Sequence, residues 1–519
     1  MAYDYRPYPY VPPPGLTAAE PRHKVLIVGA GPIGLAAAIE LANHGVPSVV
    51  VDDNDVVSVG SRAICWSKRS LEILDRLGDV GQRCVEKGVT WKVGRTHHRA
   101  AEIYNFDLLP EAGHKMPAFV NLQQYYVEEY LIEEALRRPL IDLRFKNKVV
   151  GMEPQAHHAV AVIETPDGTY RLEAEWMIAC DGARSPIRGM LGLDFAGELF
   201  EERFLIADIE MQADFPSERW FWFEPDFHPG QSALLHKQPD NIYRIDLQLG
   251  WDTDPEVEKR PENIIPRIRK VVGDRDFRLD WSSIYTFQCR RLQKFVHGPV
   301  IFAGDSAHVV SPFGARGGNG GLQDIDALGW RLAAVISGRA PATVLQDYDR
   351  ERVHGADENI LNSSRTTRFM TPAPGIERLF RDSVLSLAAH APFARALVNS
   401  GRLSVPCVYP CDGHDEAAMP PGARPGCVAP DAPLPDGWLL DALGREPVLL
   451  CLGHEAPPVG VHARVLTPVL TDLTSARYLG AAPAGLYLIR PDQIVAARWA
   501  DVDADPINQA ITHLWGNRS

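Results

Sequence analysis

The sequence predicts an α/β protein, and two observations carry this prediction. Residues 25–38, VLIVGAGPIGLAAA, place an apolar strand before a turn with Gly29, Gly31 and Gly34 and a helix of small residues. Asp52 then closes a second apolar strand, SVVVDD. Glycines at this spacing permit a tight turn, a close approach of backbone to a pyrophosphate and close helix–strand packing, while the acid holds a ribose. We therefore expect a Rossmann-like dinucleotide-binding unit whose helix N-terminus faces the phosphates.

The remaining elements are expected from composition and periodicity. Residues 1–21 are rich in Tyr and Pro and predict a flexible or surface-draped arm. Helices are expected near 67–77 and 124–137. From about 190 to 295, segments such as RWFWFEP and YRIDLQLGW alternate or run aromatic, as strands do. A sheet domain is therefore expected to interrupt the dinucleotide-binding unit.

Length and linkers give the expected domain organisation. A chain of 519 residues is too long for one ordinary core. A Pro- and Gly-rich passage indicates a linker, and WLLDAL, PVLLCLG and GLYLIR after it favour a small α/β domain. The expected units are an N-terminal arm (1–21), a dinucleotide-binding domain (22–190 and 296–400), an inserted sheet domain (191–295), and a linker with a C-terminal domain (401–519).

Charge and cysteine usage argue against several classes of protein. A net charge of −14 argues against nucleic acid or an anionic membrane as the main partner. No apolar run approaches the ~20 residues that span a bilayer, and no secretory leader opens the chain, so a cytoplasmic location is expected. The eight cysteines are scattered, and the spacing of Cys407 and Cys411 fits neither a redox pair nor a zinc site. Free thiols and no metal are expected.

Two further strand ends carry carboxylates. WMIACDGARSPIR, residues 176–188, ends an apolar strand at Asp181, and VIFAGDSAHVVSPFGARGGNGG, residues 300–321, ends another at Asp305. Doubly wound sheets bind ligands at the carboxyl ends of their strands. The glycine-rich loop of the second segment lets backbone approach a bound group closely, and the helix after it stabilises negative charge there.

Together the three motifs resemble those of the single-component (class A) FAD-dependent aromatic hydroxylases, the family of phenol hydroxylase and 3-(3-hydroxyphenyl)propionate hydroxylase. The resemblance covers nearly the whole chain. It implies a Rossmann-like FAD-binding domain with an inserted substrate-binding sheet. RPGCVAPDAPL (424–434) and LIRPDQIVAARW (488–499) resemble the thioredoxin-like C-terminal domain of phenol hydroxylase. That tail lacks C-x-x-C, so a structural role is expected, for which a homodimer interface is one candidate.

The resemblance also assigns roles to individual residues. Arg62 matches the arginine beside the diphosphate and the mobile flavin, Gln124 the glutamine on the ribityl side, and Asp305 the carboxylate that binds the ribityl chain. Asp181 and Arg188 match the motif linked to FAD and the pyridine nucleotide. The cofactor-binding residues expected in this way are Gly29, Gly31, Gly34, Asp52, Arg62, Gln124, Asp181, Arg188, Asp305, Pro312, Gly314, Gly317, Gly318 and Asn319.

Two positions depart from the family pattern. Asp53 replaces the basic residue that often follows the ribose acid. Ile64 stands where some phenol-type members carry an Asp or His that deprotonates the phenol. The sequence therefore leaves the base for this substrate unassigned.

The resemblance implies hydroxylation of a phenolic compound by O₂, with NADH or NADPH reducing FAD and a flavin hydroperoxide delivering the oxygen. The cofactor must supply the electrophilic oxygen because no side chain does. A second G-x-G-x-x-G is absent from the sequence, so a separate nicotinamide domain is not expected. Arg62, Pro312 and Tyr285 are the residues expected to take part in catalysis.

The inserted sheet is the predicted place for the substrate. Trp220 with Trp222, and Tyr285 with Phe287, lie at strand alternation, so each pair shares a face. An apolar aromatic pocket would suit a ring-containing ligand, but aromatics at this period also form ordinary sheet core. Tyr285 is the first candidate to hydrogen-bond the phenol. Candidate partners for a phenolate or carboxylate are His236, Arg244, Arg290 and Arg291.

Three other functions remain open. The segment 220–225, WFWFEP, nearly matches the W-x-W-x-I-P signature of flavin-dependent halogenases. A flavin disulfide or quinone reductase would require a redox cysteine pair or a second nucleotide fingerprint, and the sequence has neither. A flavin-binding sensor or scaffold would bind FAD without substrate-stimulated NAD(P)H oxidation.

Overall fold

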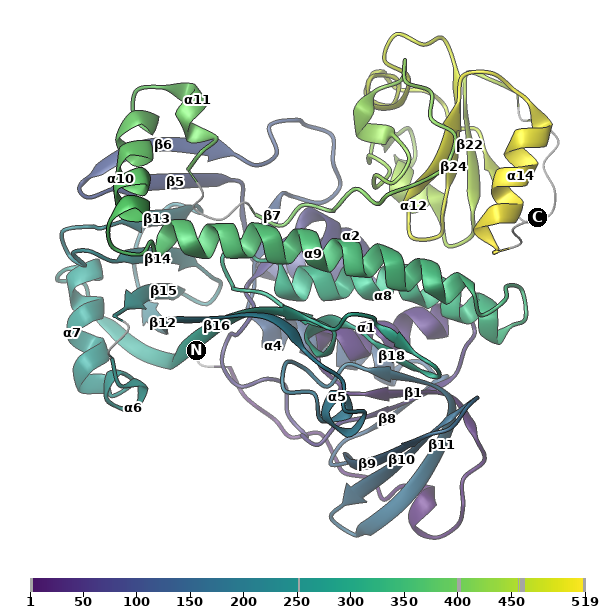
Figure 1. Ribbon diagram of the computed structural model, residues 1–519, viewed down its shortest axis with the longest axis horizontal. Coiled ribbons are helices and arrows are strands. Elements are labelled where there is room, and N and C mark those ends of the chain that lie inside the picture. The colour runs from purple at the N-terminus through teal and green to yellow at the C-terminus, as the bar shows by residue number, and fades with distance from the viewer. Residues whose placement is uncertain (1–2, 251–252, 399–402, 456, 458–462, 517–519) are drawn as a thin grey trace.

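The computed structural model describes residues 3–250, 253–398, 403–455, 457 and 463–516. The boundary expected at 400/401 lies outside these described residues. The fold is mixed α/β, as expected. Helices α8 and α9 run side by side across the middle, with a large parallel-stranded sheet on one side, a mainly antiparallel sheet at one end and the C-terminal unit at the other (Figure 1).

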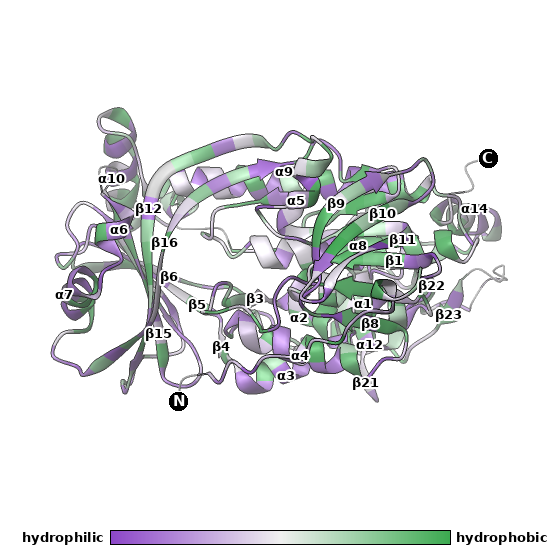
Figure 2. Cartoon of the chain, turned by 90° about the horizontal axis from the view of Figure 1, so that it is seen from below, coloured by the Kyte–Doolittle hydropathy of each residue, from purple (hydrophilic) through white to green (hydrophobic). Residues whose placement is uncertain are grey.

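The first sheet is the expected doubly wound sheet. Its central strands are parallel: β1 lies between β11 and β2, β2 also pairs with β8, and β11 also pairs with β18. Figure 2 shows β1 and β10 mainly in hydrophobic colours, as strands that are largely covered on both faces require. Its strands are β17 (Val296–His297), β18 (Val300–Phe302), β11 (Gly168–Ala179), β1 (His23–Val28), β2 (Ser48–Val51), β8 (Ile141–Arg144), β10 (Ala159–Thr165) and β9 (Lys148–Pro154).

Helices cover this sheet and form the main core with it. The small residues of α1 let it pack closely against α8, and the buried strand residues Val25–Val28 complete this core. The helices expected near 67–77 and 124–137 are present as α2 and α4. The helices of this part are α1 (Pro32–Asn43), α2 (Lys68–Asp75), α3 (Val80–Lys87), α4 (Gln124–Leu136), α5 (Pro186–Met190), α8 (Gly317–Ile336) and α9 (Val344–Met370).

The second sheet has eight strands and includes chain from outside the expected insertion. Residues 93–107 supply β5 and β6 because β5 pairs in parallel with β13. The helices packed at this end are α6 (Pro255–Glu258), α7 (Pro261–Val272), α10 (Ile376–Ala388) and α11 (Pro392–Arg395). In spatial order the strands are β19 (His308–Val309), β16 (Phe277–Arg291), β12 (Ala196–Met211), β15 (Ile242–Leu249), β14 (Ser232–Lys237), β13 (Arg219–Phe223), β5 (Val93–His98) and β6 (Ala101–Asp107).

A small third sheet joins the two large ones. It is antiparallel and consists of β3 (Cys65–Ser67), β7 (Phe119–Asn121) and β4 (Val89–Trp91). Asn121 of this sheet donates a hydrogen bond of 2.9 Å to the carbonyl of Lys237 in the second sheet. The position of this third sheet fixes the segment just before β3, and that segment lies between the two large sheets.

The N-terminal arm is draped over the surface and held by its aromatic residues. The ring of Tyr8 stacks on Phe145 at 4.8 Å, and Tyr3 lies 4.2 Å from Tyr125 between ring centres. The hydroxyl of Tyr5 accepts a 3.0 Å hydrogen bond from the backbone of Gly60. Of the two alternatives for this arm, the structure shows the draped one over its described residues.

The C-terminal part contains a four-stranded mixed sheet with helices packed against it. Two apolar clusters form its core, one on each side of the sheet. In the part of the chain that the structure describes, no helix is long and apolar enough to cross a bilayer. The elements are β20 (Pro433–Leu434), β21 (Gly437–Trp438), α12 (Leu439–Leu443), β22 (Val448–Leu452), β23 (Arg464–Leu466), α13 (Asp472–Thr474), β24 (Gly485–Ile489), β25 (Val495–Trp499) and α14 (Ala504–Leu514).

Buried ion pairs dock this unit on α2, α8 and α9. Arg490 binds Glu351 of α9 at 2.6 Å and Asp492 at 2.5 Å, and Arg331 of α8 lies 3.7 Å from Asp492. Arg69 of α2 donates to the carbonyl of Asp492 at 2.8 Å. Although burial alone raises it, attraction to Arg490 and Arg331 lowers the pKa of Asp492 to about 2. The Arg-Pro-Asp segment is therefore an interdomain contact.

We predict that Asp492→Asn weakens this docking. Arg490 and Arg331 then lose a buried counter-charge, and breaking a buried pair costs about 3–5 kcal/mol. The expected result is a lower melting temperature and faster proteolysis between residues 403 and 437. Because the pKa of Asp492 is depressed, its contribution is complete above pH ~4 and is lost as the pH falls through about 2.

Glu446→Gln provides the matched control. Glu446 pairs with Arg339 at 3.2 Å, and both side chains are about half exposed. An exposed pair contributes at most about 1 kcal/mol. Equal effects of the two substitutions would contradict the role assigned to Asp492.

Candidate functional site

Three strand ends of the first sheet converge at the predicted dinucleotide-binding turn. Gly29 follows β1 with φ +106°, and a Cβ there would overlap the carbonyl oxygen of Cys180 at the end of β11. A Cβ on Gly34 would overlap the carbonyl oxygen of Gly29. Gly31 differs, because no atom lies within 4 Å of the position of its Cβ. Gly29 and Gly34 are thus required by packing, whereas Gly31 faces open space at the N-terminus of α1.

The acid after β2 holds the turn from the other side. Asp52 accepts hydrogen bonds from the backbone of Ala30 at 2.6 Å and of Asn54 at 2.8 Å. Burial raises the pKa of Asp52, and these two bonds oppose the rise. The carboxylate remains partly exposed, so it can also reach a ligand in the space beside Gly31.

Asp305 follows β18, at the same edge of the first sheet. Its side chain is exposed, and no donor among the described residues hydrogen-bonds to it. Surrounding protein nevertheless raises its pKa by desolvation, and electrostatic interactions with His308 and Arg62 oppose that rise. A Cβ on Gly317, the first residue of α8, would lie 3.9 Å from its Oδ1 atom. Asp305 is therefore a free acceptor beside Gly317 and within electrostatic reach of Arg62.

The segment of Arg62 is held in a strained conformation. Arg62 has φ +31°, unusual for a residue with a side chain, and its carbonyl accepts a 2.6 Å hydrogen bond from Arg244 of the second sheet. Gln124 accepts from the backbone of Ala63 at 3.2 Å. Asn319 accepts from the backbone of Ser67 at 2.9 Å. The structure thus brings Arg62, Gln124 and Asn319 together, with both amides bound to this segment.

The second motif is tied to the third. One carboxylate oxygen of Asp181 accepts from Ser185 at 2.8 Å and from the backbone of Ile187 at 3.0 Å. The other oxygen is buried and has no partner among the described residues. Arg188 donates to the carbonyl of Ser306 at 2.9 Å, and its guanidinium lies 3.9 Å from the ring centre of Phe195. Arg188 therefore connects two strand ends.

The glycine-rich loop after β18 reaches the second sheet. Pro312 is exposed, whereas the ring of Phe313 is buried against Phe204 at 4.8 Å and Phe287 at 5.0 Å between ring centres. Gly314 has φ +102°, which favours glycine there. Gly318 lies next to Trp66, which places the start of α8 against β3. The loop is thus fixed on the second sheet by Phe313 and on β3 by Gly318.

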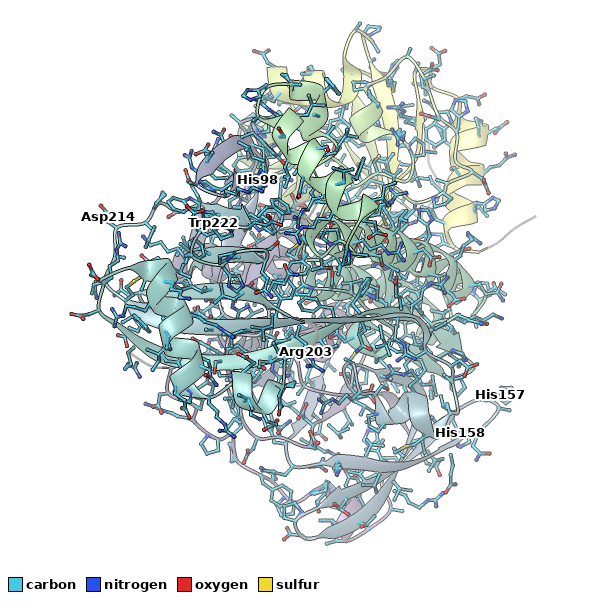
Figure 3. The ribbon with its side chains drawn as sticks, turned by 60° about the vertical axis from the view of Figure 1, so that its left-hand side comes forward. His98, His157, His158, Arg203, Asp214 and Trp222 are labelled. Atoms are coloured by element: carbon cyan, nitrogen blue, oxygen red, sulfur yellow. The ribbon has the colours of Figure 1, made fainter. Side chains whose placement is uncertain are left out.

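The predicted substrate residues divide between the two faces of the second sheet. Tyr285, half-buried, and Phe287 lie on the face that packs against Phe313, which we call the inner face. Trp220 and Trp222 pack on the outer face, on which α7 lies (Figure 3). The two pairs therefore cannot line one pocket, which corrects the expectation. Alternation defines two faces, but both are covered here, so the sequence could not show which one faces the site. The residues of β13 on the inner face are Phe221 and Phe223.

Polar residues cross the inner face in one row. Cross-strand pairing aligns Arg219, His236, Arg244 and Asp208. Arg244 binds Asp208 at 3.1 Å, and both are buried. Burial, and then the charges of Arg219 and Arg244, hold the pKa of His236 well below its usual value. His236 is therefore a neutral imidazole at pH 7.

The other two arginines considered for the substrate are bound elsewhere. Arg290 donates to the carbonyl of Phe195 at 2.8 Å, and Arg291 pairs with Asp357 at 2.6 Å. Asp246, in contrast, was missed and lies on the inner face two residues after Arg244. Its signal in the sequence was the alternation of polar and apolar residues in YRIDLQLGW, a pattern equally typical of a strand with a solvent-exposed face.

Comparison with known proteins identifies the family. A family model described as an FAD binding domain matches residues 22–363. The chain belongs to this FAD-binding family. A flavin-dependent monooxygenase of Mycobacteroides abscessus is 30% identical over 488 residues, which are 90% of this chain and 95% of the relative. A 3-(3-hydroxyphenyl)propionate/3-hydroxycinnamic acid hydroxylase of Burkholderia cenocepacia is 28% identical over 377 residues, 72% of this chain and 68% of the relative.

Solved structures show the same fold over nearly the whole chain. The flavin-dependent monooxygenase PieE, solved with FAD and substrate, has a TM-score of 0.80 at 21% identity and covers 96% of this chain and 100% of its own. An anhydrotetracycline hydroxylase from Streptomyces rimosus has a TM-score of 0.74 at 25% identity, with coverage of 96% and 100%. The chain is confirmed as a member of the expected flavoprotein monooxygenase family, and the cofactor of this family is FAD.

We predict that Asp305→Ala weakens FAD binding. The substitution removes a free carboxylate acceptor from the edge of the sheet where the three motifs meet, and a hydrogen bond to a charged group contributes about 1.5–3 kcal/mol. FAD titration of the apoprotein should give a Kd about 10–100 times higher. Asp276→Ala, at an exposed position before β16, is the control and should bind FAD as the wild type does. A normal Kd in Asp305→Ala would remove Asp305 from the cofactor site.

Proposed function

We propose that the chain is an NAD(P)H-dependent hydroxylase of phenolic compounds. The observation that carries the proposal is the arrangement of the inner face opposite the three strand ends. Tyr285 and Phe287 supply an aromatic wall there, and Arg244 supplies positive charge. FAD, when bound, supplies the electron transfer and the activation of O₂. The chain itself orients the ring, excludes water and favours the phenolate.

The residues at the strand ends fit FAD. Gly31 leaves room for a diphosphate at the N-terminus of α1, and a helix of twelve residues favours negative charge there. Asp305 offers an unpaired acceptor for the hydroxyls of the ribityl chain, and Asp52 offers a partly exposed acceptor for the ribose. The buried, unpartnered oxygen of Asp181 indicates a further group that donates to it. We assign the fourteen cofactor residues named in the sequence analysis to this site.

Arg62 and Pro312 are proposed to border the flavin ring. Arg62 is exposed, lies in a strained conformation and acts electrostatically on Asp305. Pro312 is exposed next to Phe313, which is fixed on the inner face. Both residues would be free to contact a flavin ring held near Asp305.

A fused-ring phenol is the second candidate substrate. The relative named 12-dehydrotetracycline 5-monooxygenase/anhydrotetracycline 6-monooxygenase, from Streptomyces rimosus, is 28% identical over 95% of this chain and 99% of its own length. The hydroxyphenylpropionate hydroxylase covers only 72% of the chain. Similarity over the full length supports including polycyclic phenols among the substrates to be tested.

For the C-terminal unit we propose a thioredoxin-like fold with a structural role. Its mixed sheet with flanking helices and its docking through Arg490 and Asp492 support that role. Cys407 and Cys411 are free thiols, and burial raises the pKa of each. Thiol–disulfide exchange needs a lowered thiol pKa, so we do not assign it. A homodimer remains part of this proposal.

Steady-state kinetics test the function. The FAD-loaded protein is supplied with NADH or NADPH, O₂ and single phenols: phenol, p-nitrophenol, 3-(3-hydroxyphenyl)propionate and a polycyclic phenol. We expect at least one to stimulate NAD(P)H oxidation and to yield a stoichiometric hydroxylated product. NAD(P)H oxidation that no phenol stimulates would contradict the proposal, and halogenated product in the presence of chloride would favour the halogenase alternative.

We predict that Tyr285→Phe uncouples the reaction. Tyr285 is half-buried on the inner face, and loss of its hydroxyl removes a hydrogen bond to the phenol, worth about 1 kcal/mol. The expected result is a several-fold rise in H₂O₂ released per product formed. Trp222→Phe, on the outer face, is the control with unchanged coupling. Equal coupling in Tyr285→Phe and wild type would remove Tyr285 from the mechanism.

A further inference from the structure

Asp246 differs from its neighbours on the inner face. It lies near the middle of the second sheet on β15, and it is the one residue of that strand that is not fully buried. Its Oδ1 atom is shielded from solvent and has no hydrogen-bond partner among the described residues. A buried acceptor without a partner needs an explanation. Access to solvent at a central strand indicates that a ligand group can reach this carboxylate.

Its position lies between two contacts of the FAD-binding unit with the inner face. Two residues before Asp246, Arg244 donates to the carbonyl of Arg62. Two residues after it, the next row of side chains contains Phe204, which packs on Phe313 of the glycine-rich loop. Side chains two residues apart share a face of a strand. Asp246 therefore faces the space that the Arg62 segment and the Phe313 loop enclose.

The surroundings of Asp246 are charged. Burial raises the pKa of Asp246 to about 7, the carboxylate of Asp208 on β12 adds to the rise, and Arg244 and Arg219 oppose it. The thiol of Cys65 also faces Asp246, and burial raises the pKa of Cys65 to about 12, so it stays protonated. Near neutral pH, Asp246 can therefore both lose and accept a proton beside two fixed cations.

We propose that Asp246 is the base that takes the hydroxyl proton of the phenolic substrate. This inference rests on the function proposed above. The O–H bond of the substrate breaks, its proton forms a new O–H bond on a carboxylate oxygen of Asp246, and the electron pair remains on the substrate as a phenolate. Arg244 and Arg219 stabilise that negative charge. The charge makes the ring the stronger nucleophile that hydroxylation requires.

Asp246 suits the role of base better than the other titratable residues on the inner face. A general base works best when its pKa lies near the operating pH. Asp208 is committed to Arg244 and to the hydroxyl of Ser61. His236 is neutral, but it is fully enclosed, and two cations beside it oppose its protonation. A phenol has a pKa near 10. The two arginines lower the pKa of a bound phenol and so reduce the difference between it and the pKa of Asp246.

Asp246→Asn tests the proposal in the FAD-loaded enzyme. The probe is the phenol of the panel above with the highest coupled turnover in the wild type. We expect kcat/KM to fall about 100-fold, the range of general base catalysis, with normal FAD content. Asp214→Asn is the control, because Asp214 lies exposed on an outer loop of the same sheet (Figure 3), and its activity should not change.

Two kinetic measurements separate a base from a structural residue. In the wild type, kcat/KM should rise with pH through about 7, because only the carboxylate form accepts the proton. Asp246→Asn should lose this rise. The loss of kcat/KM in Asp246→Asn should also be smaller for p-nitrophenol, because its more acidic hydroxyl ionises more readily. A structural residue would affect all phenols and all pH values alike.

Thermal melting provides a test without activity. The pKa of Asp246 is higher in the folded protein than in the unfolded chain, so its contribution to stability is complete below pH ~4 and is lost as the pH rises through about 7. The melting temperature of Asp246→Asn relative to wild type should therefore rise between pH 4 and 8. A difference independent of pH would overturn the environment that the proposal requires.

The outcomes distinguish this proposal from the proposed function. If Asp246→Asn keeps the wild-type kcat/KM and its rise with pH, Asp246 is not the base, while phenol hydroxylation stands. If the wild type shows no phenol-stimulated NAD(P)H oxidation, the function is wrong and this inference fails with it. A large loss of activity with an unchanged pH profile would assign Asp246 a structural role and overturn the proposal.

Discussion

The close approach of backbone at two strand ends is the constraint on which the rest of the structure depends. Gly34 lies against the carbonyl of Gly29, and Gly29 lies against the carbonyl of Cys180. Any side chain at Gly29 or Gly34 would push α1 away from β1 or β1 away from β11. Because these contacts bring the strand ends together, Asp52, Asp181 and Asp305 all lie at the same edge of the first sheet.

Two small contacts join the second sheet to the unit built on the first sheet. Arg244 holds the carbonyl of Arg62, and Phe313 inserts between aromatic rings of the inner face. The first contact is a charged hydrogen bond from the buried Arg244 to a partly buried carbonyl, and the second is apolar packing; both fix the second sheet against the first unit. The inner face combines aromatic side chains with buried charges. Buried charges lower the free energy of unfolding unless they are well paired, and they are common at binding and catalytic sites.

The third unit is held by buried charge as well as by apolar contact, because Trp515 packs with Trp330 of α8 and Val344 of α9. Arg490, Asp492 and Glu351 form a buried cluster to which the facing helices add further arginines. Removing any one member leaves a buried charge unpaired. The cluster fixes the C-terminal sheet on α8 and α9, the helices that begin at or pack behind the glycine-rich loop after β18.

The sequence by itself determined the three strand-end motifs and the helices after them, because glycine spacing and apolar runs act within one short stretch of chain. The order of Gly29, Gly31 and Gly34 before Asp52 predicts a local structure that needs no distant partner. Only the tertiary structure decided which face of the second sheet meets the site, since alternation gives both faces the same period. The structure placed Asp246 on the inner face and the tryptophan pair on the outer face.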